Sequence, residues 1–259
     1  MTRTMLLVID IGNSETTLGV FAGDKLRADW HLATAIHRTA DEYAALLLDL
    51  LQSRKLETTD INMAGMCSVV PPLTAVFSAL LEKYFAIKPL VVEAGIKTGV
   101  SIRMDNPREV GADRIVNAAA AHHLYKGPVI VVDLGTATTF DTVSAEGEYL
   151  GGAIAPGITA AAETMFERAA MLPQIELVKP QKAIGTNTIS AMQSGTVFGY
   201  VGLVEGMVAR IQKELGARTK VVATGGYAGL IAAETNVIDA VNPTLTLTGL
   251  RLIYNMNRA

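Results

Sequence analysis

The chain has 259 residues, enough for one large domain or two small ones with a real hydrophobic core. Its 22 basic and 25 acidic side chains give a net charge of −3, which argues against a nucleic-acid-binding face, because such faces cluster cations. Hydrophobic residues make up 50% and charged residues 18%, which excludes disorder over most of the chain.

No apolar run reaches the length of a membrane span, since each is broken within about 20 residues by a charge, a proline or a glycine cluster. The first run, residues 5–9, stops at Asp10 and is too short for the core of a signal peptide. The single cysteine, Cys67, cannot form an intramolecular disulfide and reads as a small buried hydrophobe. These features predict a cytoplasmic protein that does not contact a membrane.

Short runs rich in Val and Ile alternate with longer runs rich in Ala and Leu, which is typical of an α/β fold. In chain order, the pattern predicts strands at residues 5–9, 16–21, 63–70, 90–93, 129–132, 139–143 and 220–223. It predicts helices at residues 39–53, 71–84, 112–125, 158–170, 187–215 and 246–257. Pro71 and Pro72 suit a first helical turn, where the missing N–H has no intrahelical partner anyway.

Two segments of the chain repeat one pattern. LLVIDIGNSETTLGVFAGDKL near the start and VIVVDLGTATTFDTVSAEGEYL in the middle both read as strand, Asp-x-Gly turn, second strand and polar turn. Asp10 lies 14 positions before the turn residue Asp24, and Asp133 lies 14 positions before Gly147. The match indicates that both halves descend from one unit that begins with a β-hairpin.

The repeat predicts a division of the chain into two domains, residues 1–112 and residues 113–259. The loop between them, residues 95–111, contains Pro107 and three glycines. Loops of this composition connect domains or line active sites.

Four glycines form a stripe on one face of the predicted helix 187–215. Gly195, Gly199, Gly202 and Gly206 follow one another at steps of 4, 3 and 4 residues. Each glycine costs about 1 kcal/mol relative to alanine in a helix interior, so the stripe indicates close approach of another backbone. That backbone belongs either to a sheet of the same chain or to the same helix of a second subunit, and both alternatives stay open.

The chain has neither a P-loop nor a G-x-G-x-x-G turn, and it lacks a Cys/His cluster for zinc and the G-x-S-x-G of serine hydrolases. Each repeated hairpin instead carries a carboxylate, a glycine and then amide or hydroxyl side chains: Asp10, Gly12, Asn13 and Ser14, and Asp133, Gly135, Thr136, Thr138 and Thr139. Successive turn N–H groups bind anions, and a carboxylate can hold a cation that neutralises phosphate. The pattern predicts that two hairpins grip a polyphosphate, although each also fits an ordinary turn.

Two further sites are candidates. Gly225 and Gly226 follow the predicted strand 220–223, and bare backbone there could lie against an adenine ring or could simply form a strand-to-helix turn. Asp113 and Arg114 begin a predicted helix near the boundary of the two halves. They could carry chemistry, or Asp113 could favour the positive helix end while Arg114 pairs with a surface carboxylate.

Six motifs together identify a family resemblance. In chain order they are DIGNSETT at residues 10–17, DNPREVGADR at 105–114, VVDLGTATTFD at 131–141, GGAIAPG at 151–157, GTNT at 185–188 and ATGGYAGL at 223–230. The set is similar to that of type III pantothenate kinases and covers nearly the whole chain. The resemblance implies two ribonuclease H-like halves, as in actin and acetate kinase, around a nucleotide cleft.

The resemblance also implies an activity and its requirements. Enzymes of this kind transfer phosphate from ATP to pantothenate, the first step of coenzyme A biosynthesis. They are homodimers that need Mg²⁺ and a monovalent cation, K⁺ or NH₄⁺.

The motifs carry these roles onto particular residues. Asp113 corresponds to the proton acceptor, Asp133 to the ligand of the monovalent cation, and Asp10 is a candidate Mg²⁺ ligand. The residues that correspond to the ATP-binding positions are Asp10, Ile11, Gly12, Asn13, Ser14, Glu15, Thr16, Thr17 and Thr136, with Gly225 and Gly226 as the adenosine loop. The residues that correspond to the pantothenate site are Met104, Gly111, Ala112, Asp113, Arg114 and Thr188.

Two positions depart from the family pattern. Ser14 stands where threonine is usual and keeps the hydroxyl, and Met104 stands where a tyrosine is common and cannot supply a phenol. Two other functions compete with the implied one. A kinase of another small hydroxylated metabolite would keep both phosphate hairpins, whereas a non-enzymatic transcription accessory factor could lose Asp10, Asp113 or Asp133.

Overall fold

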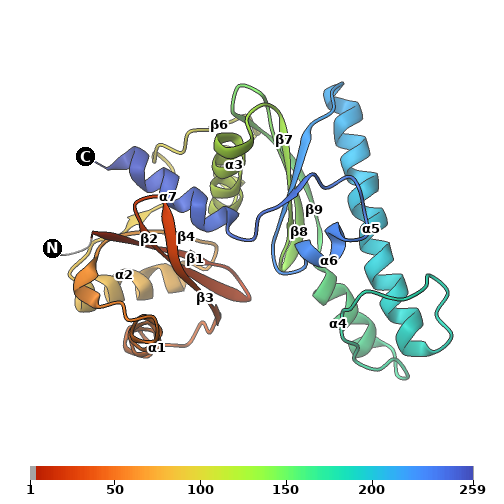
Figure 1. Ribbon diagram of the computed structural model, residues 1–259, viewed down its shortest axis with the longest axis horizontal. Helices are drawn as coiled ribbons and strands as arrows, with labels where there is room; N and C mark the ends of the chain where they lie inside the picture. The colour runs from red at the N-terminus through yellow and green to blue at the C-terminus, as the bar shows by residue number, and fades with distance from the viewer. Residues whose placement is uncertain (1–3, 259) are drawn as a thin grey trace. The chain divides into compact units, whose positions relative to one another are not determined.

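The computed structural model describes residues 4–258, and these form two compact units (Figure 1). Unit 1 contains residues up to 99 together with residues 106–120 and the C-terminal segment from residue 246. Unit 2 contains residues 100–105 and 121–245. The single boundary expected between residues 112 and 113 differs from this division, because the C-terminal segment packs on the N-terminal sheet.

Unit 1 is built from a five-stranded sheet and helices on both of its faces. In chain order its elements are β1 (Met5–Ile11), β2 (Glu15–Ala22), β3 (Lys25–Ala33), α1 (Ala40–Ser53), the 3-10 turn η1 (Thr58–Asp60), β4 (Ile61–Ser68), α2 (Pro71–Phe85), β5 (Leu90–Val91), the 3-10 turn η2 (Pro107–Glu109), most of α3 (Ala112–Tyr125) and α7 (Leu245–Asn257). The strand order is β3-β2-β1-β4-β5. Strands β1, β2 and β3 form an antiparallel meander, and β4 and β5 run parallel to β1.

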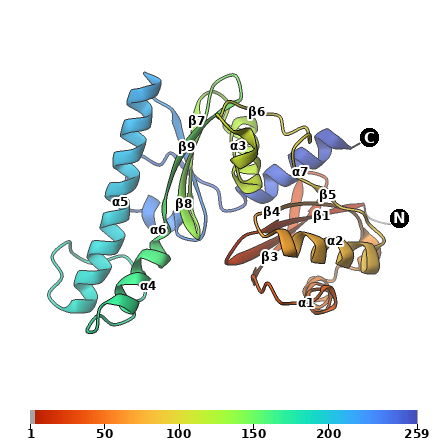
Figure 2. The ribbon, with the colours of Figure 1, turned by 180° about the vertical axis from the view of Figure 1, so that it is seen from behind.

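The faces of this sheet follow from the alternation of side chains along its strands. Leu7 and Ile9 of β1 pack with Tyr43 of α1 and Phe77 of α2 in one buried core. Figure 2 shows α1 and α2 on this face and α7 on the other. A Cβ on Gly19 of β2 would lie 3.0 Å from the side chain of Leu247, so this glycine lets α7 approach closely.

Unit 2 repeats the plan with a six-stranded sheet. Its elements are β6 (Ser101–Ile102), β7 (Val129–Leu134), β8 (Ala137–Val143), β9 (Glu148–Pro156), α4 (Ile158–Arg168), α5 (Thr188–Leu215), β10 (Lys220–Thr224), α6 (Ala228–Ala232) and β11 (Ala240–Val241). The strand order is β11-β10-β7-β8-β9-β6. The meander β7-β8-β9 with parallel β10 and β11 matches the order of the first sheet, in which β1-β2-β3 is followed by parallel β4 and β5.

The predicted helices are confirmed, and the capping residues at their ends explain why they could be predicted from the sequence. Thr39 accepts a hydrogen bond from the N–H of Glu42 and forms a capping box before α1, and Asn187 does the same before α5. Pro71 occupies the first turn of α2. Gly216 ends α5 in the left-handed conformation, at a φ of 66°.

The seven predicted strands are also confirmed, but β3, β6, β9 and β11 and the short α6 were not predicted as elements. In β3 the apolar residues Leu26, Ala28, Trp30 and Leu32 alternate with polar ones, which is a half-buried strand pattern that the prediction overlooked. In β9 a Gly-Gly pair and a terminal proline hid the strand. Strands β6 and β11 have two residues each and leave no periodic signal.

Candidate active site

The first predicted phosphate turn joins β1 to β2 in unit 1. The N–H of Gly12 donates to the carbonyl oxygen of Glu15 at 2.9 Å. A Cβ on Gly12 would lie 2.8 Å from that oxygen, so the turn requires glycine. The side chains of Asn13, Ser14 and Glu15 are exposed.

Three residues predicted in the same segment face elsewhere. Ile11 and Thr16 are fully buried, and the Thr16 hydroxyl lies 2.9 Å from the hydroxyl of Thr34. Thr17 is half-buried, with its hydroxyl 3.4 Å from Nδ1 of His31. These three side chains are therefore less exposed than those of residues 13–15, which are open to solvent.

The start of α3 places Asp113 and its neighbours. The N–H of Ile115 donates to the Gly111 carbonyl at 3.2 Å, which makes Gly111 the first capping residue. Oδ1 of Asp113 accepts the N–H of Arg114 at 2.8 Å and lies 2.5 Å from where a Cβ on Gly111 would stand. Gly111 therefore lets the Asp113 carboxylate fold back beside the helix start. Ala112, also predicted at the substrate site, is half-buried there.

Asp10 and Asp113 lie close enough to influence one another. Asp10 ends β1 opposite Cys67 of the parallel strand β4, and the Cys67 thiol donates to Oδ1 of Asp10 at 3.2 Å. The pKa of Asp10 is raised from 3.8 to about 7, chiefly by burial; the Cys67 hydrogen bond opposes this shift, and the negative charges of Asp113 and Glu15 add to it. Burial and the neighbouring Asp10 raise the pKa of the Cys67 thiol. Unit 1 thus holds two carboxylates beside an open turn.

The second phosphate turn joins β7 to β8 in unit 2. The N–H of Gly135 donates to the carbonyl of Ala137 at 3.1 Å, and Thr136 between them is exposed. This turn is one residue shorter than the first. Three residues lie between the paired Leu134 and Thr138, whereas four lie between the paired Ile11 and Thr16. Asp133 ends β7 and is half-buried.

The predicted adenosine loop lies against this turn. Thr224 of β10 pairs with Asp133, and Gly225 follows at a φ of +90°. A Cβ on Gly225 would lie 2.7 Å from Oδ1 of Asp133 and 2.7 Å from the carbonyl oxygen of Leu134. The carboxylate oxygen of Asp133 and the carbonyl oxygen of Leu134 therefore both lie beside Gly225, which has no side chain to separate them from the loop. Gly226 is exposed beside them.

Met104, the residue that replaces the common tyrosine, follows β6 and lies against Gly151 of β9. A Cβ on Gly151 would lie 2.9 Å from the Met104 sulfur, and Gly151 has a φ of +107°. The thioether therefore occupies space that any side chain at position 151 would need, and Gly151 sets where Met104 lies.

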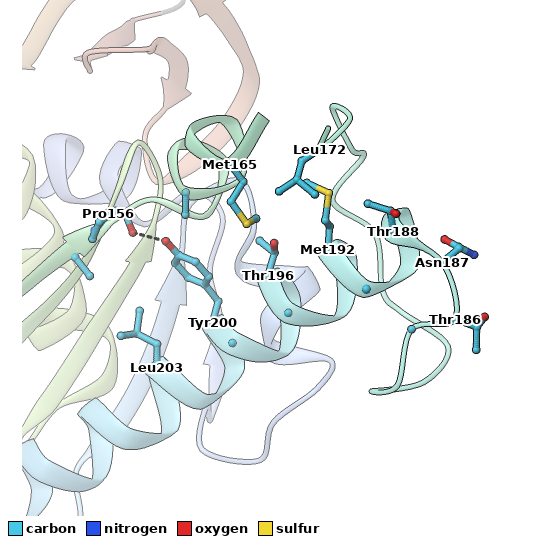
Figure 3. A pocket seen from close by; sticks show the side chains of 16 residues that line it. Pro156, Met165, Leu172, Thr186, Asn187, Thr188, Met192, Thr196, Tyr200 and Leu203 are labelled. Carbon is cyan, nitrogen blue, oxygen red and sulfur yellow. Dashed lines mark hydrogen bonds between the residues drawn. The ribbon is translucent and has the colours of Figure 1, made fainter. Parts of the chain in front are cut away.

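Thr188 lines a separate, mainly apolar groove in unit 2 with a cavity volume of about 1080 Å³. Figure 3 shows Met192, Thr196, Tyr200 and Leu203 along α5 on one wall and Met165 of α4 facing them. The remaining lining residues are Ala155, Pro156, Ala161, Leu172, Gly185, Thr186, Asn187, Ala191, Gly195 and Gly199.

The glycine stripe of α5 does not pack against the sheet of its own unit. Added Cβ atoms on Gly195, Gly199 and Gly202 would meet nothing within 4 Å, and one on Gly206 would meet only the guanidinium of Arg210, at 3.1 Å. Of the two alternatives open at the sequence level, the same-chain sheet finds no support among the described residues.

Neither a protein-built metal cage nor a membrane helix is found in the described part of the chain. Among residues 4–258, no three His, Cys, Asp or Glu side chains gather in a way that could hold a metal ion. No helix within the same range is both long and apolar enough to cross a bilayer.

Comparisons of the sequence show which known proteins this chain is similar to. The sequence model of a family described as type III pantothenate kinase matches residues 6–210. A type III pantothenate kinase from Dehalococcoides mccartyi is 59% identical over 254 residues, which is 98% of each chain. Another from Moorella thermoacetica is 53% identical over 253 residues, covering 98% of this chain and all of the relative.

Solved structures share the fold at low identity. A putative Baf family transcriptional activator from Campylobacter jejuni superimposes with a TM-score of 0.61 at 21% identity, covering 97% of this chain and 98% of its own. A putative 2-dehydro-3-deoxygalactonokinase from Sinorhizobium meliloti reaches a TM-score of 0.57 at 14% identity, with the same coverage. These likenesses confirm the predicted α/β fold class with its two related halves.

Proposed function

The chain belongs to the type III pantothenate kinase family, and from that premise we propose that it transfers the γ-phosphoryl group of ATP to the primary hydroxyl of pantothenate. The observation that carries the proposal is the pair Asp10 and Asp113 in unit 1, close enough for the charge of Asp113 to raise the pKa of Asp10. A carboxylate pair beside an anion-binding turn suits phosphoryl transfer to an alcohol.

Asp113 accepts the proton that the pantothenate hydroxyl loses as it attacks phosphorus. The transition state of such reactions is largely loose, so positioning and charge neutralisation contribute more than base strength. The open turn 12–15 holds phosphate through its N–H groups, and Asn13 and Ser14 add side-chain donors. Thr136 plays the same part in the second turn, and Gly225 and Gly226 offer bare backbone to the adenosine.

Mg²⁺ fits the donor set at the end of β1. Asp10 offers a carboxylate whose ionisation is opposed by Asp113 and Glu15, so a bound cation would relieve like-charge repulsion there. Because no protein cage exists among the described residues, Asp10 would share the ion with phosphate oxygens, as is usual for Mg²⁺. With ATP bound, an Mg²⁺ ion held by Asp10 would supply positive charge that neutralises the phosphates.

Asp133 fits a monovalent cation, K⁺ or NH₄⁺. Its Oδ1 and the carbonyl oxygen of Leu134 both lie close to Gly225, and such oxygens replace the hydration shell of K⁺.

The Asp133→Ala variant should lose the activation by K⁺ and most of the activity, because the proposed cation site loses its charged oxygen. Activity and thermal unfolding, each measured with and without K⁺, test this. Glu146→Ala, which removes an exposed carboxylate from the same unit, should respond to K⁺ like the parent. Equal K⁺ stimulation of Asp133→Ala and the parent would place the cation elsewhere.

A coupled assay of ADP formation tests the reaction itself. ADP should form when pantothenate is present and should form faster with K⁺ or NH₄⁺. ADP formation with glucose, glycerol or a keto-deoxy sugar acid but not with pantothenate would favour the kinase of another hydroxylated metabolite. No ADP with any acceptor would favour the non-enzymatic alternative, which the presence of Asp10, Asp113 and Asp133 disfavours.

The proposed partner surface is a homodimer contact on the glycine stripe of α5. Open space beside Gly195, Gly199 and Gly202 and the apolar groove along the same helix support it. Gly199→Leu with Gly202→Leu should raise the dimer dissociation constant roughly ten- to hundredfold, since overpacking a tight contact costs about 1–3 kcal/mol. Sedimentation measures the change. Gly229→Leu, on α6 with equally open space, is the control. An unchanged dimer would show that the stripe lies outside the contact.

The absence of nucleic-acid binding, expected from the net charge of −3, and the cytoplasmic location, expected from the single cysteine, stay predictions.

A further inference from the structure

Thr34 follows directly after β3 and reaches back to the first phosphate turn. Its hydroxyl donates to the carbonyl of Gly12 at 2.8 Å, and its N–H donates to the carbonyl of Ser14 at 3.0 Å. The hydroxyls of Thr34 and Thr16 lie 2.9 Å apart. One residue therefore contacts the turn at two points and the adjoining strand β2 at a third, and none of the assigned roles explains this arrangement.

These contacts orient the peptide groups of the turn. In a trans peptide, the carbonyl of one residue and the N–H of the next point in opposite directions, and the described chain contains no cis peptide bond. Because the Gly12 carbonyl points to Thr34, the N–H of Asn13 points away from it. The Ser14 carbonyl turns the N–H of Glu15 away in the same manner. The carbonyl oxygens of Gly12 and Ser14, which would repel phosphate, are thus held on the side of Thr34.

The second unit has a corresponding residue in the same place. Gly157 directly follows β9, as Thr34 directly follows β3. A Cβ on Gly157 would lie 2.6 Å from the Gly135 carbonyl oxygen and closer still to that of Thr136. Tyr200 of α5 holds the preceding residue, since its hydroxyl donates to the Pro156 carbonyl at 2.8 Å. The residue after the third strand therefore lies against the phosphate turn in both units.

We propose that Thr34 is a positioning residue for the nucleotide: its hydroxyl fixes the first phosphate turn so that backbone N–H groups face the polyphosphate. The inference rests on the proposed function for the identity of the ligand, but it concerns only nucleotide binding. Thr34 itself contacts the turn and transfers no proton.

The test compares Thr34→Val, which keeps the shape of the side chain and removes the hydroxyl, with Thr34→Ser, which keeps the hydroxyl. Titration calorimetry with ADP and with a non-hydrolysable ATP analogue reports binding without turnover. Thr34→Val should weaken binding about tenfold, the equivalent of roughly one lost hydrogen bond. Thr34→Ser should bind within about twofold of the parent, and the KM of ATP should rise more than the KM of pantothenate.

Thr235→Val is the matched control. The Thr235 hydroxyl donates to Oε1 of Glu205 at 2.7 Å, so this variant loses a comparable hydrogen bond away from both turns and should keep parental nucleotide binding. Parental binding by Thr34→Val, or equal loss in Thr34→Ser and Thr34→Val, would overturn the proposal. If Thr34→Val does not fold, Thr34→Ala decides by the same criterion. A parent that binds nucleotide but does not phosphorylate pantothenate would refute the proposed function and leave this inference standing.

Discussion

Asp113→Asn is expected to lower kcat by about 10²–10⁴, the usual contribution of a general base, while ATP binding survives. An ionised carboxylate at this position can accept the proton of the pantothenate hydroxyl as the hydroxyl attacks phosphorus. Asparagine keeps the oxygen that accepts the Arg114 N–H at 2.8 Å, and it therefore preserves the start of α3. It removes only the charge and the basicity.

Steady-state kinetics with saturating ATP and pantothenate, together with thermal unfolding, measure the two effects separately. Asp49→Asn removes an exposed carboxylate from α1 of the same unit and should turn over like the parent. An Asp113→Asn variant that works within a few-fold of the parent would exclude Asp113 as the base. Loss of stability without a specific loss of turnover would instead favour its role at the helix start.

The helices and central strands were predictable because their signals are local. Capping residues such as Thr39 and Asn187 lie next to the helices that they begin, and the buried runs of β1 and β7 are almost continuously apolar. Strand β3 was missed although Leu26 to Leu32 alternate, because its charged residues suggested a polar turn. Its loss mattered, since β3 is the element that carries Thr34 to the phosphate turn.

The candidate site was predictable only where one segment contains it. The Asp-x-Gly turns at Asp10 and Asp133 could be read directly, and their shared place in the repeat is matched by the strand order of the two sheets. Thr34 lies 22 residues from Gly12, and Cys67 lies 57 residues from Asp10. Only the strand register brings these pairs together, and no spacing rule in the sequence contains that register.

The place of the C-terminal helix was likewise beyond local reasoning. Helix α7 was predicted, but its sequence does not say which sheet it covers. Glycines at positions 19 and 65 leave room for Leu247 and Tyr254 on the first sheet, and this packing explains why residues from 246 onward group with unit 1. A single boundary along the chain, as expected from the repeat, cannot describe a C-terminal segment that packs back on the N-terminal sheet.

Asp10→Asn is expected to have two opposite effects, a loss of activity and a gain of stability at neutral and higher pH. Asp10 is the candidate ligand for the ion that neutralises the phosphates, and removing one preorganised electrostatic group costs on the order of 10²–10³ in kcat. In the absence of metal and nucleotide, however, the Asp10 carboxylate is opposed by its burial and by Asp113 and Glu15. Replacing it by a neutral amide removes that repulsion.

The pH dependence follows from the direction of the shift. The pKa of Asp10 rises from 3.8 to about 7 in the folded chain, so between these values the folded chain holds a proton that the unfolded chain has released. Stability must then fall as pH rises through this window, because the unfolded state binds fewer protons. The stabilisation that comes from keeping Asp10 protonated is fully present below pH 3.8 and is lost above about pH 7. Asparagine does not titrate, so the variant should lack this slope.

Urea unfolding of parent and variant in EDTA, at several pH values from 4 to 8, reports the effect of Asp10 and the groups beside it, because the more distant groups titrate alike in both proteins. The two stability curves should diverge with rising pH, the variant becoming the more stable one, and Mg²⁺ with ADP should reverse the difference by binding only the parent tightly. Parallel curves would mean that Asp10 ionises normally in the folded chain. In that case the repulsion between Asp10 and Asp113 would not be the feature that prepares this edge of the sheet for a cation.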